Sequence, residues 1–88
     1  PKPETIKAVE DCQLAGIKVM MITGDHPITA KAIAKELGIS KTQTMDDVLS
    51  GKELETFSVE ELRKRVENIT VFARVSPLHK LKIVEALQ

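Results

Sequence analysis

Two short apolar segments constrain the fold of this 88-residue chain most strongly, because a polar turn and a helical pattern led by proline follow each of them directly. The first segment, residues 17–22, runs into Thr-Gly-Asp, and the second, residues 69–74, ends at an arginine before Val-Ser-Pro. Short segments that are apolar almost throughout are typical of strands covered on both faces of a parallel sheet. We therefore expect two buried strands.

Helical patterns alternate with these strands. Each begins or ends at a recognisable cap, such as Pro27 at a first turn, Gly38 at a C-terminus, or Ser58 and Ser76 at an N-terminus. The expected helices span residues 3–15, 27–37, 58–67 and 77–88. Strands and helices that alternate with short joints predict parallel strands with crossover helices. The predicted fold class is α/β, a three-layer Rossmann-like parallel sheet.

The stretch between the second and third helices is the hardest to interpret, and residues 48–50 are its one candidate strand. Buried parallel strands need more neighbours than two or three, so we expect a partial domain. The chain opens on Pro1 rather than on methionine, which also suggests an excised piece.

Composition excludes several classes of function. Thirteen basic and thirteen acidic residues give a net charge of zero, so no nucleic-acid partner is expected. Phe57 and Phe72 are the only aromatic residues, and Cys12 is the only cysteine, which excludes an internal disulfide. No apolar run approaches the roughly 18 residues of a membrane helix, so the chain itself is expected to be soluble.

Ligands of open parallel sheets bind beyond the carboxyl ends of the strands. Thr23, Gly24 and Asp25 follow the first expected strand, where Gly24 would allow close approach of backbone N–H groups and Thr23 would add a hydroxyl. This combination suits a phosphate, although a simple turn and helix start would use the same residues. Asp25 would orient the loop, face a ribose or a metal, or only start the helix.

The second loop leads to Lys80, which is expected near the middle of a helix face formed by apolar residues, namely Leu81, Ile83, Val84 and Leu87. A lysine there either extends along the apolar surface to solvent or places its ammonium group over the strand ends, where it would suit phosphoryl oxygens. Arg74 ends the second strand, and it would contact a base or ribose or form a surface salt bridge.

The remaining polar residues give weaker evidence of a functional site. His26 and His79 have no third ligand at metal spacing, so no metal site is expected and both are interpreted as loop or helix-start residues. Asp46 and Asp47 lie in a polar stretch and are expected to be solvated.

Two long segments resemble cation-transporting P-type ATPases. Residues 17–30, IKVMMITGDHPITA, resemble the TGD segment of that family, and residues 71–84, VFARVSPLHKLKIV, resemble its FAR…P…K segment. The opening PKPE is similar to the family's proline-rich entry to this region. The resemblance covers essentially the whole chain and is weakest over residues 40–68.

The resemblance implies a haloacid-dehalogenase-like phosphorylation domain, in a pump that transfers the γ-phosphoryl group of ATP to an aspartate with magnesium. It implies that Thr23 and Gly24 contact the phosphoryl group and that Asp25 shapes the nucleotide and phosphate site. Arg74 would contact the nucleotide, in particular its ribose. Lys80 would neutralise charge on the phosphoryl group, so Lys80 and Thr23 are the implied catalytic residues.

The chain departs from the family pattern at two decisive points. It contains neither the DKTGT motif of the nucleophilic aspartate nor the GDGxND motif of the magnesium site. We therefore predict that residues 1–88 form a partial phosphorylation domain that is inactive alone and binds neither ATP nor magnesium stably.

The implied partners of the chain are ATP and the nucleotide-binding, actuator and transmembrane domains of the parent pump, with this segment on the cytoplasmic side of a membrane. His79 and Lys80 after Ser-Pro most resemble calcium pumps, and residues 24–31 are also similar to sodium/potassium pumps. Two alternatives stay open, namely a stand-alone nucleotide-binding or interaction module and pairing of exposed sheet edges with a second copy.

Overall fold

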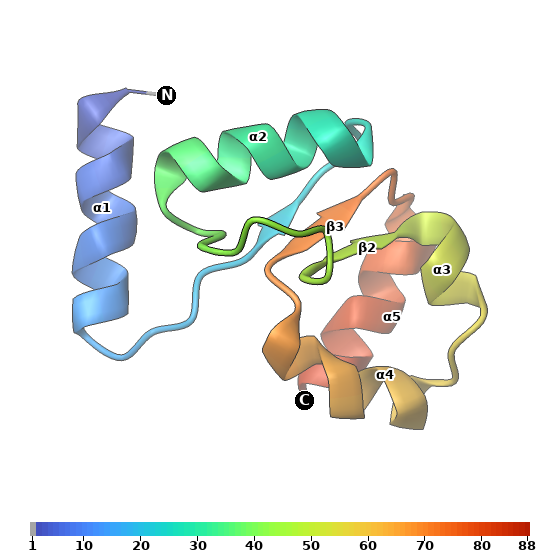
Figure 1. The fold of residues 1–88 in the computed structure, drawn as a ribbon. Helices are drawn as coiled ribbons and strands as arrows, with labels where there is room; N and C mark the ends of the chain where they lie inside the picture. Colours follow the sequence, from blue (N-terminus) through green and yellow to red (C-terminus); the bar gives the residue numbers. More distant parts are fainter. Residues whose placement is uncertain (1) are drawn as a thin grey trace.

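The computed structural model describes residues 2–88, so the opening proline and its expected role lie outside the described residues. Five α-helices, one 3-10 helix and three strands follow one another in this part of the chain (Figure 1). They are α1 (Pro3–Leu14), β1 (Met21–Ile22), α2 (Pro27–Leu37), β2 (Val48–Ser50), α3 (Gly51–Glu55), α4 (Val59–Arg65), η1 (Val66–Asn68), β3 (Val71–Ala73) and α5 (Pro77–Leu87). No helix among them is long and apolar enough to cross a membrane.

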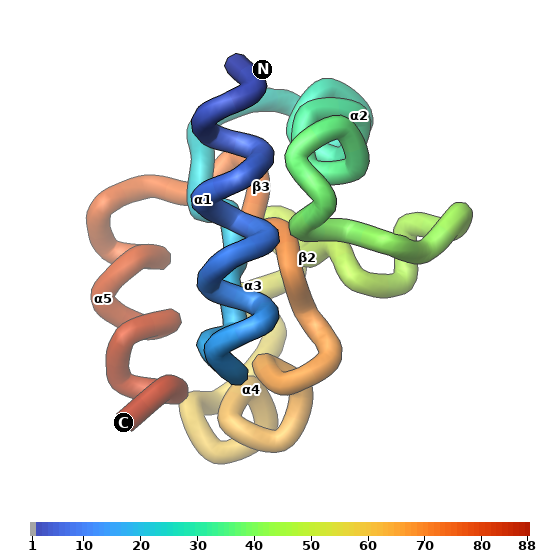
Figure 2. The backbone as a smooth tube through the Cα atoms, turned by 90° about the vertical axis from the view of Figure 1, so that its left-hand side faces the viewer, coloured from blue at the N-terminus to red at the C-terminus, as the bar shows by residue number. Residues whose placement is uncertain are grey.

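The three strands form one parallel sheet in the order β1-β3-β2, with β3 in the centre. Met21 and Val48 both align with Val71, so the three strands start at one level. Every residue of β3 is fully buried, and Val71 and Ala73 face one side of the sheet while Phe72 faces the other. The predicted three-layer α/β arrangement is confirmed, with the sheet between two layers of helices (Figure 2).

Each face of the sheet carries its own hydrophobic core. One core lies between the sheet and α3, α4 and α5 and is formed by Leu49, Leu54, Leu62, Val66, Ile69, Phe72, Ile83 and Ala86. The other lies on the side of α1 and α2 and is formed by Val9, Ala30, Ala34, Ile39, Val48, Val71 and Ala73. The second core is the smaller in side-chain volume, since alanines of α2 bring that helix close to the strands.

The two predicted strands are shorter than expected. The first covers only Met21–Ile22 of the predicted 17–22, and Ile17 is 57% exposed. An edge strand has a hydrogen-bonding partner on one side only, so pairing cannot begin before β3 begins at Val71. The second covers Val71–Ala73 of the predicted 69–74. It begins late because Ile69 caps the 3-10 turn η1, and it ends early because Arg74 turns into a left-handed conformation with φ 55°.

The stretch that was hardest to interpret contains the candidate strand and one helix that was not predicted. Val48–Ser50 forms β2, as expected. Ser50 then caps α3 through a capping box with Glu53, the same device that Ser58 and Glu61 provide for α4 as predicted. The helix starting after Ser58 ends at Arg65 and continues as the 3-10 turn η1, within the predicted 58–67.

The apolar face predicted for the last helix is only partly correct. Ile83 and Ala86 are the buried residues of α5, whereas Leu81, Val84 and Leu87 are 44–62% exposed. Residues three apart share one helix face, and the face through Ile83 and Ala86 is the one that meets the sheet.

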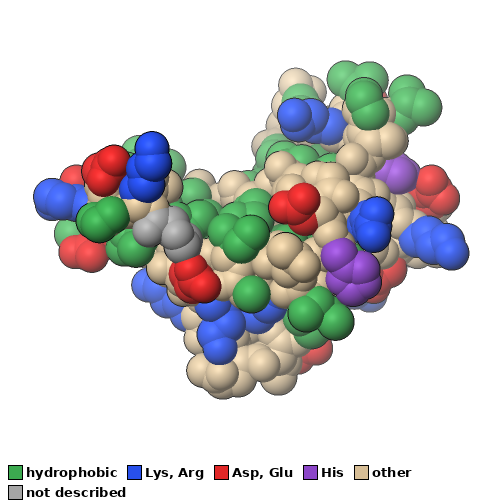
Figure 3. All heavy atoms as spheres, turned by 90° about the horizontal axis from the view of Figure 1, so that it is seen from above, with side chains coloured by type: hydrophobic (Ala, Val, Ile, Leu, Met, Phe, Trp, Pro, Cys, Tyr) green, Lys and Arg blue, Asp and Glu red, His purple; other side chains and the backbone are tan. Residues whose placement is uncertain are grey.

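Seen from above, hydrophobic side chains gather in the hollow between α1 and the rest of the molecule (Figure 3).

The expectation that Asp47 is solvated is wrong. Asp47 is 4% exposed and forms an ion pair with Lys31 of α2, which is 6% exposed, at 2.7 Å. Ser40 and Thr70 donate hydroxyl hydrogen bonds to its other carboxylate oxygen at 2.6 and 2.5 Å. Burial raises the pKa of Asp47, but the hydrogen bonds from Lys31, Ser40 and Thr70 outweigh burial and hold that pKa well below its usual range.

Candidate functional site

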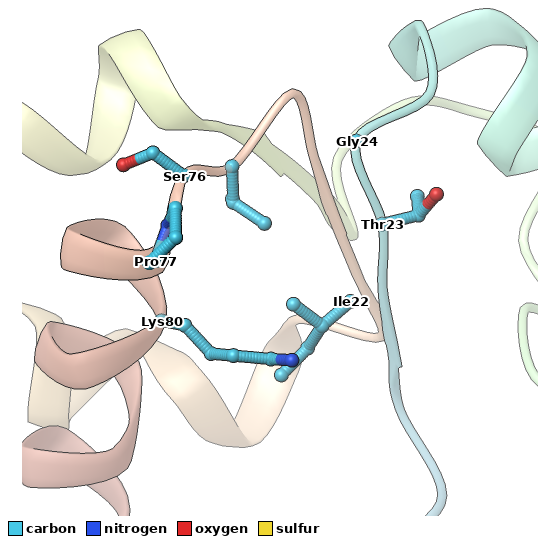
Figure 4. A pocket seen from close by; sticks show the side chains of 7 residues that line it. Ile22, Thr23, Gly24, Ser76, Pro77 and Lys80 are labelled. Atoms are coloured by element: carbon cyan, nitrogen blue, oxygen red, sulfur yellow. The ribbon is translucent and has the colours of Figure 1, made fainter.

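A shallow cavity of about 250 Å³ opens at the carboxyl ends of β1 and β3. The first loop and the end of β1 line one side of it, and the start of α5 with the loop before it lines the other (Figure 4). The lining residues are Ile22, Thr23, Gly24, Val75, Ser76, Pro77 and Lys80. The structure thus brings together three of the five predicted site residues, Thr23, Gly24 and Lys80.

Backbone hydrogen bonds hold the two loops at this edge together. Thr23 N–H donates to the Phe72 carbonyl at 2.9 Å, and the Thr23 carbonyl accepts from Val75 N–H at 3.3 Å. Arg74 N–H donates to the Asp25 carbonyl at 3.1 Å. Because these bonds continue the β1–β3 pairing beyond the strands, the separation of the two sides of the cavity is set by backbone geometry.

Lys80 extends across the cavity from α5, and its ammonium group ends beside Ile22 of β1 (Figure 4). The residue as a whole is exposed. Of the two alternatives stated for Lys80, the structure thus has the side chain over the strand ends.

Thr23 contributes its backbone rather than its hydroxyl to the cavity. Its side chain points away from the cavity in Figure 4, and Thr23 Oγ1 accepts a hydrogen bond from Asp25 N–H at 3.1 Å. Asp25 is exposed and does not line the cavity. The hydroxyl and Asp25 thus form a local turn that fixes the loop at the point where Gly24 meets the cavity.

Gly24 has open space where a side chain would begin. A Cβ built at Gly24 would have no heavy atom within 4 Å, and the residue does not adopt a left-handed φ. The fold itself would therefore accept alanine at this position. A glycine with open space around it, in the loop that precedes a helix, allows a bound anion to approach the backbone closely.

Arg74 lies at the same edge but outside the cavity lining. Its left-handed φ of 55° is uncommon for a residue with a side chain and costs of the order of 1–2 kcal/mol. Gly51 of α3 accommodates this turn, since a Cβ there would collide with the Arg74 carbonyl oxygen. Arg74 is exposed, as either a nucleotide contact or a surface salt bridge would require.

His79 lies at the start of α5, as interpreted from the sequence, but sequence reasoning missed its contacts. Ser76 is its N-cap as predicted, but the other half of the capping box is His79, whose Nδ1 accepts from Ser76 N–H at 2.9 Å. The opposite ring nitrogen, Nε2, lies 2.8 Å from Glu55 Oε1. The Ser-x-x-His spacing was the available signal, because position N3 is where a capping box places its second acceptor.

The cavity has the electrostatics of an anion site. Both α2 and α5 begin at this edge of the sheet, so their positive N-terminal ends and the Lys80 ammonium group contribute the same sign of potential. The residues present therefore fit a phosphoryl group. No three His, Cys, Asp or Glu side chains of residues 2–88 gather to hold a metal ion.

Comparison with known proteins identifies the family of the chain. The model of the haloacid dehalogenase-like hydrolases matches residues 1–88, and the chain belongs to this family. The chain is 53% identical over its full length to a calcium-transporting ATPase of Bacillus subtilis and 48% identical to calcium-transporting ATPase 1 of Bacillus cereus. It is also 50% identical to the cation-transporting ATPase pma1 of Synechocystis.

These matches confirm the resemblance to cation-transporting ATPases that the TGD and FAR segments predicted. The chain spans about a tenth of the length of these curated relatives, since each alignment covers 100% of the chain and 10% of the relative.

Proposed function

We propose that this chain is part of the phosphorylation domain of a P-type cation-transporting ATPase and provides half of its phosphoryl-transfer site. The observation that carries the proposal is that Gly24 and Lys80, far apart in the sequence, line one cavity at the carboxyl edge of the sheet. The parent protein would bind ATP and lie in a membrane, with this segment on the cytoplasmic side.

The proposed roles follow from chemistry at that edge. Phosphoryl transfer depends on positioning and on stabilising charge at the phosphoryl oxygens. Lys80 would place its ammonium group against those oxygens, and the Gly24 backbone N–H would donate a hydrogen bond to them. Thr23 N–H and Asp25 N–H already donate to the Phe72 carbonyl and to Thr23 Oγ1. Thr23 would hold the loop in place through its backbone, since its hydroxyl group points away from the cavity and accepts from Asp25 N–H.

Asp25 and Arg74 complete the proposal at the rim of the cavity. Asp25 would shape the site through the turn that its N–H forms with Thr23, rather than by direct contact. Arg74 would contact the nucleotide, in particular its ribose, because it is exposed and follows the carboxyl end of β3, at the same edge of the sheet as the cavity. The sequence has neither DKTGT nor GDGxND, and the proposal therefore includes that the isolated chain forms no aspartyl phosphate.

The proposed cargo of the parent is calcium. Two of the similar proteins are named as calcium-transporting ATPases, from Bacillus subtilis and Bacillus cereus. A third is named only as a cation-transporting ATPase, and sodium and potassium remain the second candidate cargo. Calcium-stimulated against sodium- and potassium-stimulated ATP hydrolysis by the parent would decide between the two.

Lys80→Ala in the full-length parent tests the central role. The variant should reduce aspartyl-phosphate formation from ATP by roughly 100- to 1,000-fold, the span measured for removing one charge-stabilising donor. Lys64→Ala, which removes an exposed lysine of α4, is the matched control and should leave phosphorylation unchanged. Normal turnover of Lys80→Ala would refute the assigned role.

An ATP titration of the 88-residue chain tests the site directly by amide chemical shifts. Shifts clustered at Thr23, Gly24, Arg74 and Lys80 at millimolar ATP support the proposal. Shifts clustered elsewhere would favour a different binding module, and the same titration with magnesium should move the same residues.

A further inference from the structure

All three polar groups of Ser76 are used in starting α5. Its hydroxyl oxygen accepts from His79 N–H at 3.3 Å, and its own N–H donates to His79 Nδ1 at 2.9 Å. Its carbonyl oxygen accepts from Lys80 N–H at 3.0 Å, which is the first hydrogen bond of the helix. The backbone of Lys80 is therefore linked to the His79 ring through one residue, Ser76.

The His79 ring is held from its other side by α3. His79 Nε2 lies 2.8 Å from Glu55 Oε1, and the side chain is only 16% exposed. The ring packs against Gly51 so closely that a Cβ there would lie 2.7 Å from ring Cε1 and Nδ1. Lys82, one turn of α5 further on, donates to the Leu54 carbonyl at 2.7 Å and forms a second tie between the two helices.

These contacts define the protonation state of the ring. Nδ1 accepts from a backbone N–H, so it carries the lone pair, and the proton is on Nε2, which donates to Glu55. A second proton would have to bind at Nδ1, where it would face the Ser76 N–H donor. The ring would then donate from Nδ1 to Ser76 Oγ, now 3.2 Å away, and the Ser76 N–H would lose its acceptor.

We propose that His79 is a positioning residue for Lys80, and that a proton at Nδ1 breaks the cap at Ser76 and loosens the first turn of α5, from which Lys80 extends into the phosphoryl cavity. The part of this proposal that concerns phosphoryl groups rests on the proposed function. A capping box ordinarily has Glu or Gln at this position, which keeps its acceptor at neutral pH, whereas histidine is the side chain that gains a proton between pH 8 and about 5.

The charged groups around the ring act in opposite directions. Glu55 of α3 carries negative charge at the ring, while the positive N-terminal end of α5 and the Lys80 ammonium group contribute charge of the opposite sign. Lys82 is engaged with the backbone of α3. A proton at Nδ1 would therefore break the hydrogen bond from Ser76 N–H, while the ring stays between Glu55 and Gly51.

The first test needs no substitution. The ¹⁵N shifts of the His79 ring in the chain should report the Nε2–H tautomer at pH 8, and the Ser76 and Lys80 amide resonances should move together with the ring as pH falls to about 5. The Nδ1–H tautomer at pH 8, or amides that do not follow the ring, would overturn the proposal. This outcome is independent of any pump activity.

Variants then separate positioning from packing. His79→Gln keeps an acceptor and a donor but cannot titrate in this range, so it should retain the cap and abolish the pH response of the Ser76 amide. His79→Ala should lose the cap and lower the folded-to-unfolded ratio by roughly 2- to 30-fold, the range for removing a helix cap. His26→Gln, at the N-cap of α2, is the matched control and should leave the Ser76 response intact.

In the full-length parent, His79→Gln should form aspartyl phosphate as wild type at pH 8 and retain more of that level than wild type at about pH 5.5. Identical pH profiles for wild type and His79→Gln would refute the link to Lys80. If those profiles are identical but Lys80→Ala loses phosphorylation, only the role of His79 is refuted and the proposed function stands. Normal phosphorylation in Lys80→Ala would overturn the proposed function itself.

Discussion

The buried ion pair between Lys31 and Asp47 allows a quantitative prediction for the substitution Lys31→Met. Methionine has nearly the length of lysine and no charge, so the variant removes the ammonium group with little change in volume. It would leave the Asp47 carboxylate 4% exposed and without its ionic partner. Breaking a buried pair by removing one member costs about 3–5 kcal/mol, because the remaining charge stays desolvated.

The expected loss is large relative to the stability of such a chain. At the usual value per residue, 88 residues give a free energy of unfolding of roughly 4–13 kcal/mol. Ser40 and Thr70 still donate to the carboxylate in the variant, so we expect the lower half of the range, about 3–4 kcal/mol. Urea unfolding followed by circular dichroism at pH 7 measures the difference.

Two further variants make the result decisive. Lys7→Met breaks the exposed Lys7–Asp11 pair of α1, whose side chains are 76% and 57% exposed, and it should cost less than about 1 kcal/mol. Lys31→Met combined with Asp47→Asn removes both charges and should recover part of the loss. A cost for Lys31→Met no larger than that for Lys7→Met would refute the conclusion that this pair is buried and coupled.

Two other predictions concern pH and the open glycine. The folded-state pKa of Asp47 is depressed, so its contribution to stability is complete above the unfolded pKa of about 3.9 and is lost as pH falls below that value. The free energy of unfolding, measured from pH 7 to 2, should therefore decrease below about pH 3.9. The decrease should be smaller in Asp47→Asn. Gly24→Ala should change the urea midpoint little, since its Cβ meets no atom, and should weaken ATP binding to the chain, measured by amide shifts. A clear loss of stability in Gly24→Ala would show that the fold itself requires the glycine.

Local signals in the sequence predicted the parts of this structure that depend on near neighbours. Pro27 and Gly38 bound α2 as expected, and Ser58 forms its capping box with Glu61, because caps join residues only a few positions apart. The loop at Gly24 and the helix start before Lys80 were placed at one edge because parallel strands end together. Each of these depends on spacing that a single chain displays.

Other features depend on partners distant in the sequence. Asp47 looked like a solvated residue in a polar stretch, and only its pairing with Lys31, sixteen positions away, makes burial favourable. The apolar pattern of α5 contained two candidate faces, and the position of the sheet selects the one through Ile83 and Ala86. The single partner of β1 shortened that strand in the same way, since backbone pairing needs a neighbour.

The buried polar network and the open cavity lie at opposite ends of the same strands and are mechanically joined. The Asp47 carbonyl accepts from Thr70 and Val71 N–H at 2.9 and 3.1 Å, which sets the start of β3 against β2. Three residues later the strand ends, and Arg74 N–H bonds to the loop that carries Gly24. β3 is short and fully buried, so it cannot shift along its neighbours. The register of β3 against β2, which is set at Asp47, therefore also fixes the two sides of the cavity. The network therefore contributes to the site by fixing the positions of the strands, although none of its side chains lines the cavity.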